Sequence, residues 1–132
     1  MTRNEKVLVI SDGPEQFALA ASALGNEGYS VMFASDVKES LRIANAESPN
    51  MIISELAMSD IDGLQICRQF RKDKAMRTTP ILLVGDLSET SSIVEDGRRC
   101  GASDYVQRPF TFDALARRVK EMLDPQSLYA LN

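Results

Sequence analysis

The sequence predicts a doubly wound α/β domain with a five-stranded parallel sheet, and two observations lead to this fold class. Short apolar runs alternate five times with segments of helical periodicity. The chain has 132 residues, 44% of them hydrophobic, which is enough for one buried core and one domain. We expect one globular unit over residues 1–124 and a C-terminal tail or linker over residues 125–132.

The expected strands are rich in Val, Ile, Leu and Met, which is typical of a parallel sheet buried on both faces. They cover residues 7–10, 29–33, 51–53, 81–84 and 105–106. Parallel neighbours need a crossover connection, and a helix is the usual one, so we expect a helix after each strand.

Helix start signals follow the strands in order. Pro14 can begin the first helix, Asp36 with Glu39 resembles a capping box for the second, and Thr111 can cap the fifth. Residues 64–72 predict the third. The side chains expected to face the core are Phe17, Ala20, Ala21, Leu24, Leu41, Ala44, Cys67, Phe70, Phe112, Leu115, Val119 and Met122. Ser, Thr and Gly weaken the fourth segment, residues 88–102, which we expect to be short or mobile.

Composition excludes several function classes. The chain has no histidine, which excludes a phosphohistidine carrier, a His-based triad and His-ligated zinc. A net charge of −4 argues against direct nucleic-acid binding. Cys67 and Cys100 are not in a metal-ligand spacing and are expected to be reduced. No apolar run is long enough to span a bilayer and no signal-peptide pattern is present, so we expect a cytoplasmic protein with no membrane partner.

Polar residues gather where the strands end. In an open parallel sheet, ligands bind beyond the carboxyl ends of the strands. The first strand ends in Ser11-Asp12, the third in Glu55, the fourth in Gly85 and the fifth in Arg108-Pro109. Two carboxylates and one guanidinium are expected to converge there. The turn "SDGPEQ" has no Gly-rich phosphate loop, which argues against dinucleotide or ATP binding by those loops.

Five segments in order resemble the receiver domain of bacterial response regulators, the CheY-like superfamily, over residues 5 to 123. They are "VLVISDGPE", "EGYSVMFASD", "MIISELAMSDIDGLQICRQFR", "TPILLVG" and "CGASDYVQRPFTFDAL". The resemblance implies the sheet order 2-1-3-4-5 with five flanking helices, and a role in two-component phosphorelay signal transduction.

The resemblance also shows where this chain departs from the family. Receivers have two acidic residues after the first strand, and here these positions hold Ser11 and Asp12. The phosphoacceptor aspartate is replaced by Glu55, the hydroxyl residue that ends the fourth strand by Gly85, and the lysine before the proline by Arg108. The switch aromatic of the fifth strand is kept as Tyr105.

These departures predict a degenerate receiver, or pseudo-receiver. Mg²⁺ requires about six well-placed oxygen ligands. The chain loses one acid at Ser11, and the longer Glu55 intrudes on the site. We expect no cofactor and no metal; Asp12, Glu55 and Ala57 are the only weak metal candidates, and Mg²⁺ enters only if the site is phosphorylated. Arg108 can hold a carboxylate with both ends of its fork, so we hypothesise that it pairs with Glu55 or Asp12. The competing interpretation is that Glu55 and Arg108 have simply drifted.

Three functions stay open. The first is a pseudo-receiver that binds a protein partner through residues 86–123, either alone or with an attached output domain. The second is a phosphorylatable regulator that uses Glu55, Ser54 or Ser59, and the third is a small-ligand sensor with an anion on Arg108. Enzymatic catalysis is least expected, because no nucleophile–base pair is visible and no catalytic residue is assigned.

Basic residues at the end of the third helix form a separate feature. They are Arg68, Arg71, Lys72, Lys74 and Arg77, with Asp73 as the only acid among them. The simpler interpretation is a solvated helix end, where cations complement the helix dipole. The alternative is a docking surface for an acidic partner, and the same choice applies to Arg98-Arg99 and to Arg117-Arg118-Lys120.

Overall fold

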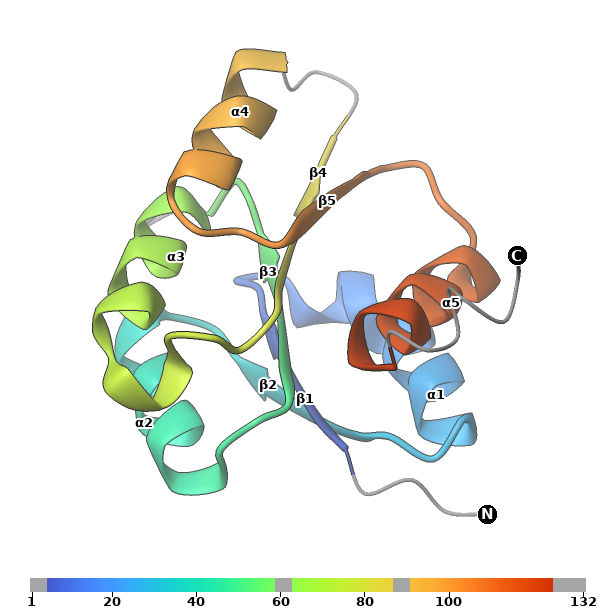
Figure 1. The fold of residues 1–132 in the computed structure, drawn as a ribbon. Helices are drawn as coiled ribbons and strands as arrows, with labels where there is room; N and C mark the ends of the chain where they lie inside the picture. Colours follow the sequence, from blue (N-terminus) through green and yellow to red (C-terminus); the bar gives the residue numbers. More distant parts are fainter. Residues whose placement is uncertain (1–4, 59–62, 87–90, 125–132) are drawn as a thin grey trace.

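One parallel sheet forms the centre of the molecule, with helices on both of its faces (Figure 1). The structure is a computed structural model, and it describes residues 5–58, 63–86 and 91–124. The strands are β1 Lys6–Ile10, β2 Ser30–Ala34, β3 Met51–Glu55, β4 Ile81–Gly85 and β5 Asp104–Gln107. Their order in the sheet is β2-β1-β3-β4-β5, and every neighbouring pair is parallel. The predicted fold class and strand order are confirmed.

In the described part of the chain, five α-helices connect and follow the strands. They are α1 Ala18–Asn26, α2 Val37–Glu47, α3 Gly63–Lys72, α4 Ser91–Arg99 and α5 Phe112–Leu123. The predicted caps are present: the Asp36 carboxylate accepts a hydrogen bond from the backbone N–H of Glu39 at 2.7 Å, and the Thr111 hydroxyl accepts one from Ala114. The Glu39 carboxylate accepts from the backbone N–H of Ser35, one residue before the partner that a capping box uses.

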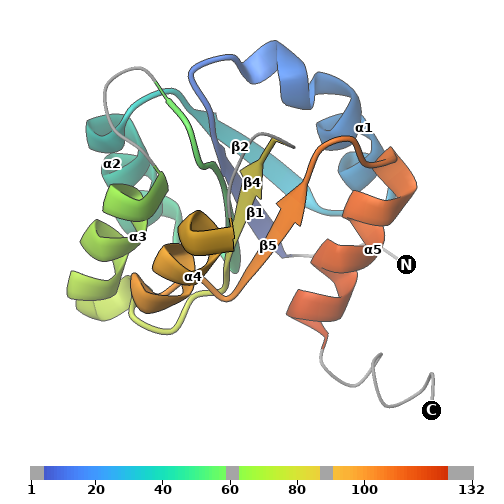
Figure 2. The ribbon, with the colours of Figure 1, turned by 90° about the horizontal axis from the view of Figure 1, so that it is seen from above.

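The helices divide into two layers. Helices α2, α3 and α4 cover one face of the sheet, and α1 and α5 cover the other (Figures 1 and 2). Successive strand residues point to opposite faces, so Leu8 lies in the core under α2 and α3, while Val9 lies in the core under α1 and α5. Burial of both faces explains the unbroken apolar runs of the central strands.

Three local predictions need correction. The chain from Pro14 begins as a 3-10 helix, η1 Pro14–Phe17, before α1. Strands β2 and β5 are not buried on both faces, because they are the two edge strands and each has a neighbour on one side only; Phe33 of β2 is 37% exposed. Phe112 is 43% exposed rather than part of the core, because it is the first residue of α5 and a helix end has fewer neighbours than its middle.

Helix α4 agrees with its weak sequence signal. Within the described residues it spans nine residues, Ser91–Arg99, inside the segment 88–102 that the sequence predicts to be short or mobile. Cys100, directly after it, is buried, as the pattern predicts. The predicted apolar anchors Ile93 and Val94 have side chains that lie outside the described part of the structure, as does the whole tail 125–132.

Candidate functional site

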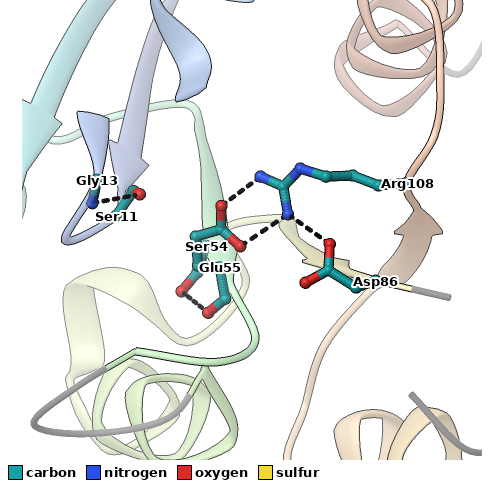
Figure 3. A network of polar contacts seen from close by, with 6 residues as sticks. All are labelled: Ser11, Gly13, Ser54, Glu55, Asp86 and Arg108. Carbon is teal, nitrogen blue, oxygen red and sulfur yellow. Dashed lines mark hydrogen bonds and ion pairs between the residues drawn. The ribbon is translucent and has the colours of Figure 1, made fainter. Parts of the chain in front are cut away.

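The carboxyl ends of three neighbouring strands bring the predicted site residues together. Glu55 is the last residue of β3, Gly85 is the last residue of β4, and Arg108 directly follows β5. The register places Glu55 opposite Val84, and Gly85 opposite Gln107, so the three strands end at the same edge of the sheet. The side chain of Arg108 extends from the end of β5 towards Glu55 (Figure 3). Gly85, at the end of the strand between them, contributes no side chain.

Arg108 holds Glu55 with both ends of its guanidinium. Nη1 donates to Oε2 of Glu55 at 3.1 Å, and Nη2 donates to Oε1 in a second, shorter bond (Figure 3). The side chain of Glu55 is only 8% exposed and that of Arg108 is 26% exposed. A bidentate geometry in a poorly hydrated place is the strong form of this contact. The hypothesis that Arg108 pairs with a carboxylate of the site is confirmed, with Glu55 as its partner.

Two further groups hold the guanidinium in place. Nη1 of Arg108 also lies 3.4 Å from Oδ1 of Asp86, and the Arg108 guanidinium lies over the ring of Phe17, 5.4 Å from the ring centre. Hydrogen bonding to Glu55 raises the pKa of Arg108, with the charges of Glu55 and Asp86 adding to the effect and burial opposing it. The sequence interpretation missed both groups. Asp86 directly follows Gly85, which stands at the hydroxyl position of the family pattern. Inspection of the residue next to that position could have identified Asp86 as part of the site.

Two serines near the site, Ser11 and Ser54, form local hydrogen bonds to the backbone. The Ser11 hydroxyl accepts a hydrogen bond from the backbone N–H of Gly13 at 3.1 Å, and Ser11 is 1% exposed. The Ser54 hydroxyl donates to the backbone carbonyl of Glu55 at 3.0 Å and is fully buried (Figure 3). A buried, hydrogen-bonded hydroxyl is a poor phosphate acceptor, which weighs against Ser54. Ser59, the other candidate serine, lies outside the described residues.

These residues do not fit a magnesium site. Both carboxylate oxygens of Glu55 accept from Arg108, and Ser11 brings no negative charge. Asp12 is exposed, and Ala57 has only a backbone carbonyl to offer. Within residues 5–58, 63–86 and 91–124, no group of three or more acidic or Cys side chains is placed to bind a metal ion. A divalent cation would have to displace a guanidinium that already neutralises the carboxylate.

The switch-equivalent positions lie on β4 and β5. The backbone N–H of Arg108 donates to the carbonyl of Gly85 at 2.8 Å, but Gly85 has no hydroxyl to follow a ligand at the site. Tyr105 is half-buried and packs against the core under α2, α3 and α4. Next to it, Asp104 forms an ion pair with Arg118 of α5, which ties the edge strand to the last helix.

The chain is similar to known signalling proteins over nearly all of its length. The family model described as the response regulator receiver domain matches residues 7–120. The alkaline phosphatase synthesis transcriptional regulatory protein PhoP of Bacillus subtilis is 35% identical over 120 residues, which are 91% of this chain and 49% of that protein. The probable transcriptional regulator ycf27 of Porphyridium aerugineum is 33% identical, over 92% of this chain and 49% of that protein. The chain thus spans about half the length of the curated relatives it matches.

Solved structures show the same likeness. The chemotaxis response regulator CheY4 of Vibrio cholerae aligns with a TM-score of 0.83 at 27% identity, over 92% of this chain and all (100%) of that chain. A response regulator structure from Chloroflexus aurantiacus aligns with a TM-score of 0.84, also at 27% identity, over 92% and 98% of the two chains. Among the described residues, no helix combines the length and the apolar character that a membrane span requires.

Proposed function

The chain belongs to the response regulator receiver domain family, and we propose that it is the signal-receiving module of a two-component regulator. Its relatives are response regulators and transcriptional regulators by name and are about twice as long as this chain, which supports an attached or separate output partner. The proposed contact surface is residues 86–123, which include Tyr105 and the Asp104–Arg118 pair. A cytoplasmic location fits this role and is part of the proposal.

Two modes of signalling are possible for such a module: phosphorylation at the site, or protein contact without phosphorylation. The comparisons favour the phosphorelay alternative over the pseudo-receiver hypothesis, because the matched proteins are response regulators and transcriptional regulators by name. They lend the pseudo-receiver hypothesis no support of their own. The local geometry favours the opposite mode, and the observation that carries it is the bidentate contact between Arg108 and the buried Glu55.

On that geometry we propose signalling without phosphorylation of Glu55. Phosphoryl transfer needs a free carboxylate oxygen, in-line access and charge neutralisation, which a metal usually provides. Here both oxygens of Glu55 accept from Arg108, and the side chain is 8% exposed. A guanidinium in contact with the acceptor carboxylate therefore takes the place of the incoming phosphoryl group and its metal.

The ligand-sensor alternative has weaker support. An anionic ligand needs a cation with charge to spare, but the Arg108 guanidinium already contacts the carboxylates of Glu55 and Asp86. An anion would have to compete with two groups that are covalently positioned. We therefore do not favour an anion site on Arg108.

A gain-of-function experiment tests the proposed mode. The wild-type chain and the S11D/E55D/R108K variant are each incubated with Mg²⁺ and acetyl phosphate, and with beryllofluoride as a phosphoryl mimic. We expect the intact mass and the amide NMR spectrum of the wild type to stay unchanged, and the variant to gain one phosphoryl group and site-centred shifts. The variant keeps Asp12, so it combines two acids beside β1 with a shorter acceptor.

Two results would decide against the proposed mode. A stoichiometric mass increase of the wild type that peptide mapping places on Glu55 would establish the phosphorelay alternative. Mg²⁺-dependent beryllofluoride shifts in the wild type would show that Arg108 leaves the carboxylate readily. An E55D variant that retains Arg108 and Ser11 is the matched control, and it is expected to stay inert because it still lacks the second acid.

A further inference from the structure

Residues of α3 and α4, together with Cys100 directly after α4, line a basic groove that includes neither Glu55 nor Arg108. The two helices lie on the same face of the sheet (Figures 1 and 2). The groove has a volume of about 410 Å³. Its lining consists of Arg68, Arg71, Lys72, Asp96, Arg99 and Cys100. Four cations and one carboxylate thus surround a hollow in a chain whose net charge is −4, so positive charge is concentrated at this groove.

Arg71 forms the fixed floor of the basic groove. Its Nε donates to the carbonyl of Gly101 at 2.9 Å, and its Nη1 donates to the carbonyls of Met76 and Thr79, both at 2.8 Å. Its aliphatic stem lies against Gly101, where an added Cβ would come within 2.6 Å of Cγ. These bonds join the end of α3 to the turns before β4 and β5. The groove is therefore a built feature with a rigid positive base.

The rim of the basic groove holds uncompensated charge. Arg68, Lys72 and Arg99 are exposed and form no ion pair with any residue in the described part of the chain. The neighbouring Arg98, by contrast, lies 3.5 Å from Glu95. Solvated single cations are common on surfaces, but three beside one hollow raise the local positive potential together.

From this arrangement we infer that the basic groove binds an acidic helical segment of a partner protein. Arg68 and Lys72 are four residues apart on α3, so they lie on one side of that helix, with Cβ atoms about 6 Å apart. Carboxylates four residues apart on a partner helix have the same spacing. Arg99 faces them from the α4 side, and the aliphatic stems of the cations give the partner apolar surface to cover.

Nucleic acid fits the basic groove less well. The net charge of −4 opposes the long-range attraction on which phosphate-backbone binding depends. The groove lining contains no aromatic side chain on which a base could stack. A short acidic segment samples only the local field and needs neither feature.

The test uses a labelled helical peptide with Glu at i and i+4 positions and Leu on the flank, and a twin peptide with every Glu replaced by Gln. Fluorescence anisotropy measures binding of both peptides to the wild type, to R68E/K72E and to K38E/R42E. The last variant is the matched control, since Lys38 and Arg42 are also cations four residues apart, on α2. Arg71 stays unchanged in all proteins, because its loss would disturb the fold.

We expect the wild type to bind the Glu peptide saturably and more weakly as salt rises. R68E/K72E should lose roughly tenfold or more of this affinity, whereas K38E/R42E should stay within about twofold. Absence of binding, equal binding of the Gln peptide or equal losses in both variants would each overturn the inference. Tighter binding of a DNA duplex that R68E/K72E abolishes would assign the basic groove to nucleic acid instead. Self-association of the wild type that R68E/K72E abolishes would assign it to a second copy of the chain.

Discussion

Replacement of Arg108 by Met tests the central contact of the site, because it removes the guanidinium but keeps an unbranched apolar side chain. Glu55, with a side chain 8% exposed, would lose its bidentate partner. Removal of one partner from a fully buried pair costs about 3–5 kcal/mol, and an exposed pair contributes about 0–1 kcal/mol. Arg108 is 26% exposed and lies between these limits. We expect R108M to lower the free energy of unfolding by about 2–4 kcal/mol.

The partner substitution should cost less. E55Q leaves Arg108 with Asp86 at 3.4 Å and with access to water, so no buried charge is stranded. We expect E55Q to lower the free energy of unfolding by about 1 kcal/mol. R108M should therefore lose more unfolding free energy than E55Q, because Glu55 is more deeply buried than Arg108. In the double variant R108M/E55Q, the cost should be less than the sum of the single costs, with a coupling free energy of about 1–3 kcal/mol.

Urea unfolding followed by far-UV circular dichroism measures all four proteins of this cycle. The midpoints should fall without a change in slope, which would show that the loss is in native-state stability. R108M and E55Q should differ clearly in midpoint. If R108M stays within about 0.5 kcal/mol of the wild type, the scatter of an ordinary surface substitution, then Arg108 does not neutralise Glu55 in solution. A coupling free energy near zero would likewise mean that the two side chains do not interact in solution.

The other predictions concern the scaffold. Burial raises the pKa of the Cys67 thiol to about 12 from its ordinary 9.0, so the unfolded chain loses that proton first as pH rises, and native stability falls between pH 9 and 12. The C67A variant has no such thiol, so its free energy of unfolding, measured with urea, should fall by up to about 4 kcal/mol less than that of the wild type over this pH range. Equal slopes of the unfolding free energy against pH in the two proteins would contradict this expectation. G101A, at φ +104 and with a Cβ 2.6 Å from Cγ of Arg71, should lose about 1–3 kcal/mol. Its control G25A, inside α1 with nothing within 4 Å, should gain up to about 1 kcal/mol, and equal thermal midpoints for the two would refute the strain argument. D36A removes the N-cap bond of α2 and should cost about 1 kcal/mol by the same assay, with no loss if the cap is not formed in solution.

The fold was predictable from the sequence because burial on both faces of a parallel sheet leaves unbroken apolar runs. The two edge strands, β2 and β5, were the exceptions. Phe33 of β2 is 37% exposed, yet its run reads like that of a central strand. The position of a strand in the sheet is a property of the whole topology, and local periodicity does not contain it. The prediction that Phe112 belongs to the core was wrong for a similar reason. An apolar stripe does not show that its first residue lies at a helix end, where it has few neighbours.

At the candidate site, the sequence predicted the Glu55–Arg108 contact but missed Asp86 and Phe17. In a parallel sheet the carboxyl ends of β3 and β5 lie at the same edge, so the sequence places Glu55 and Arg108 there together. Arg108 has a long side chain that can reach a carboxylate two strands away. Asp86 has a side chain 59% exposed, and its part in the site depends on the path that the Arg108 side chain takes. Along that path the guanidinium lies over the ring of Phe17, a contact between residues 91 positions apart that no local pattern encodes.

The four departures from the family pattern are physically connected. A glutamate at position 55 places its carboxylate one methylene further from the strand than an aspartate would, which brings it towards a guanidinium extended from position 108. A lysine in that place offers a point charge and lacks the planar pair of parallel N–H donors that matches the two carboxylate oxygens. Gly85, the last residue of β4, brings no side chain to the strand end that lies between those of Glu55 and Arg108. With the carboxylate neutralised in this way, the loss of an acid at Ser11 leaves no unpaired charge behind. Each of the four changes is thus compatible with a site in which Arg108 neutralises Glu55. This consistency favours a retained Glu55–Arg108 contact over independent drift of the two residues.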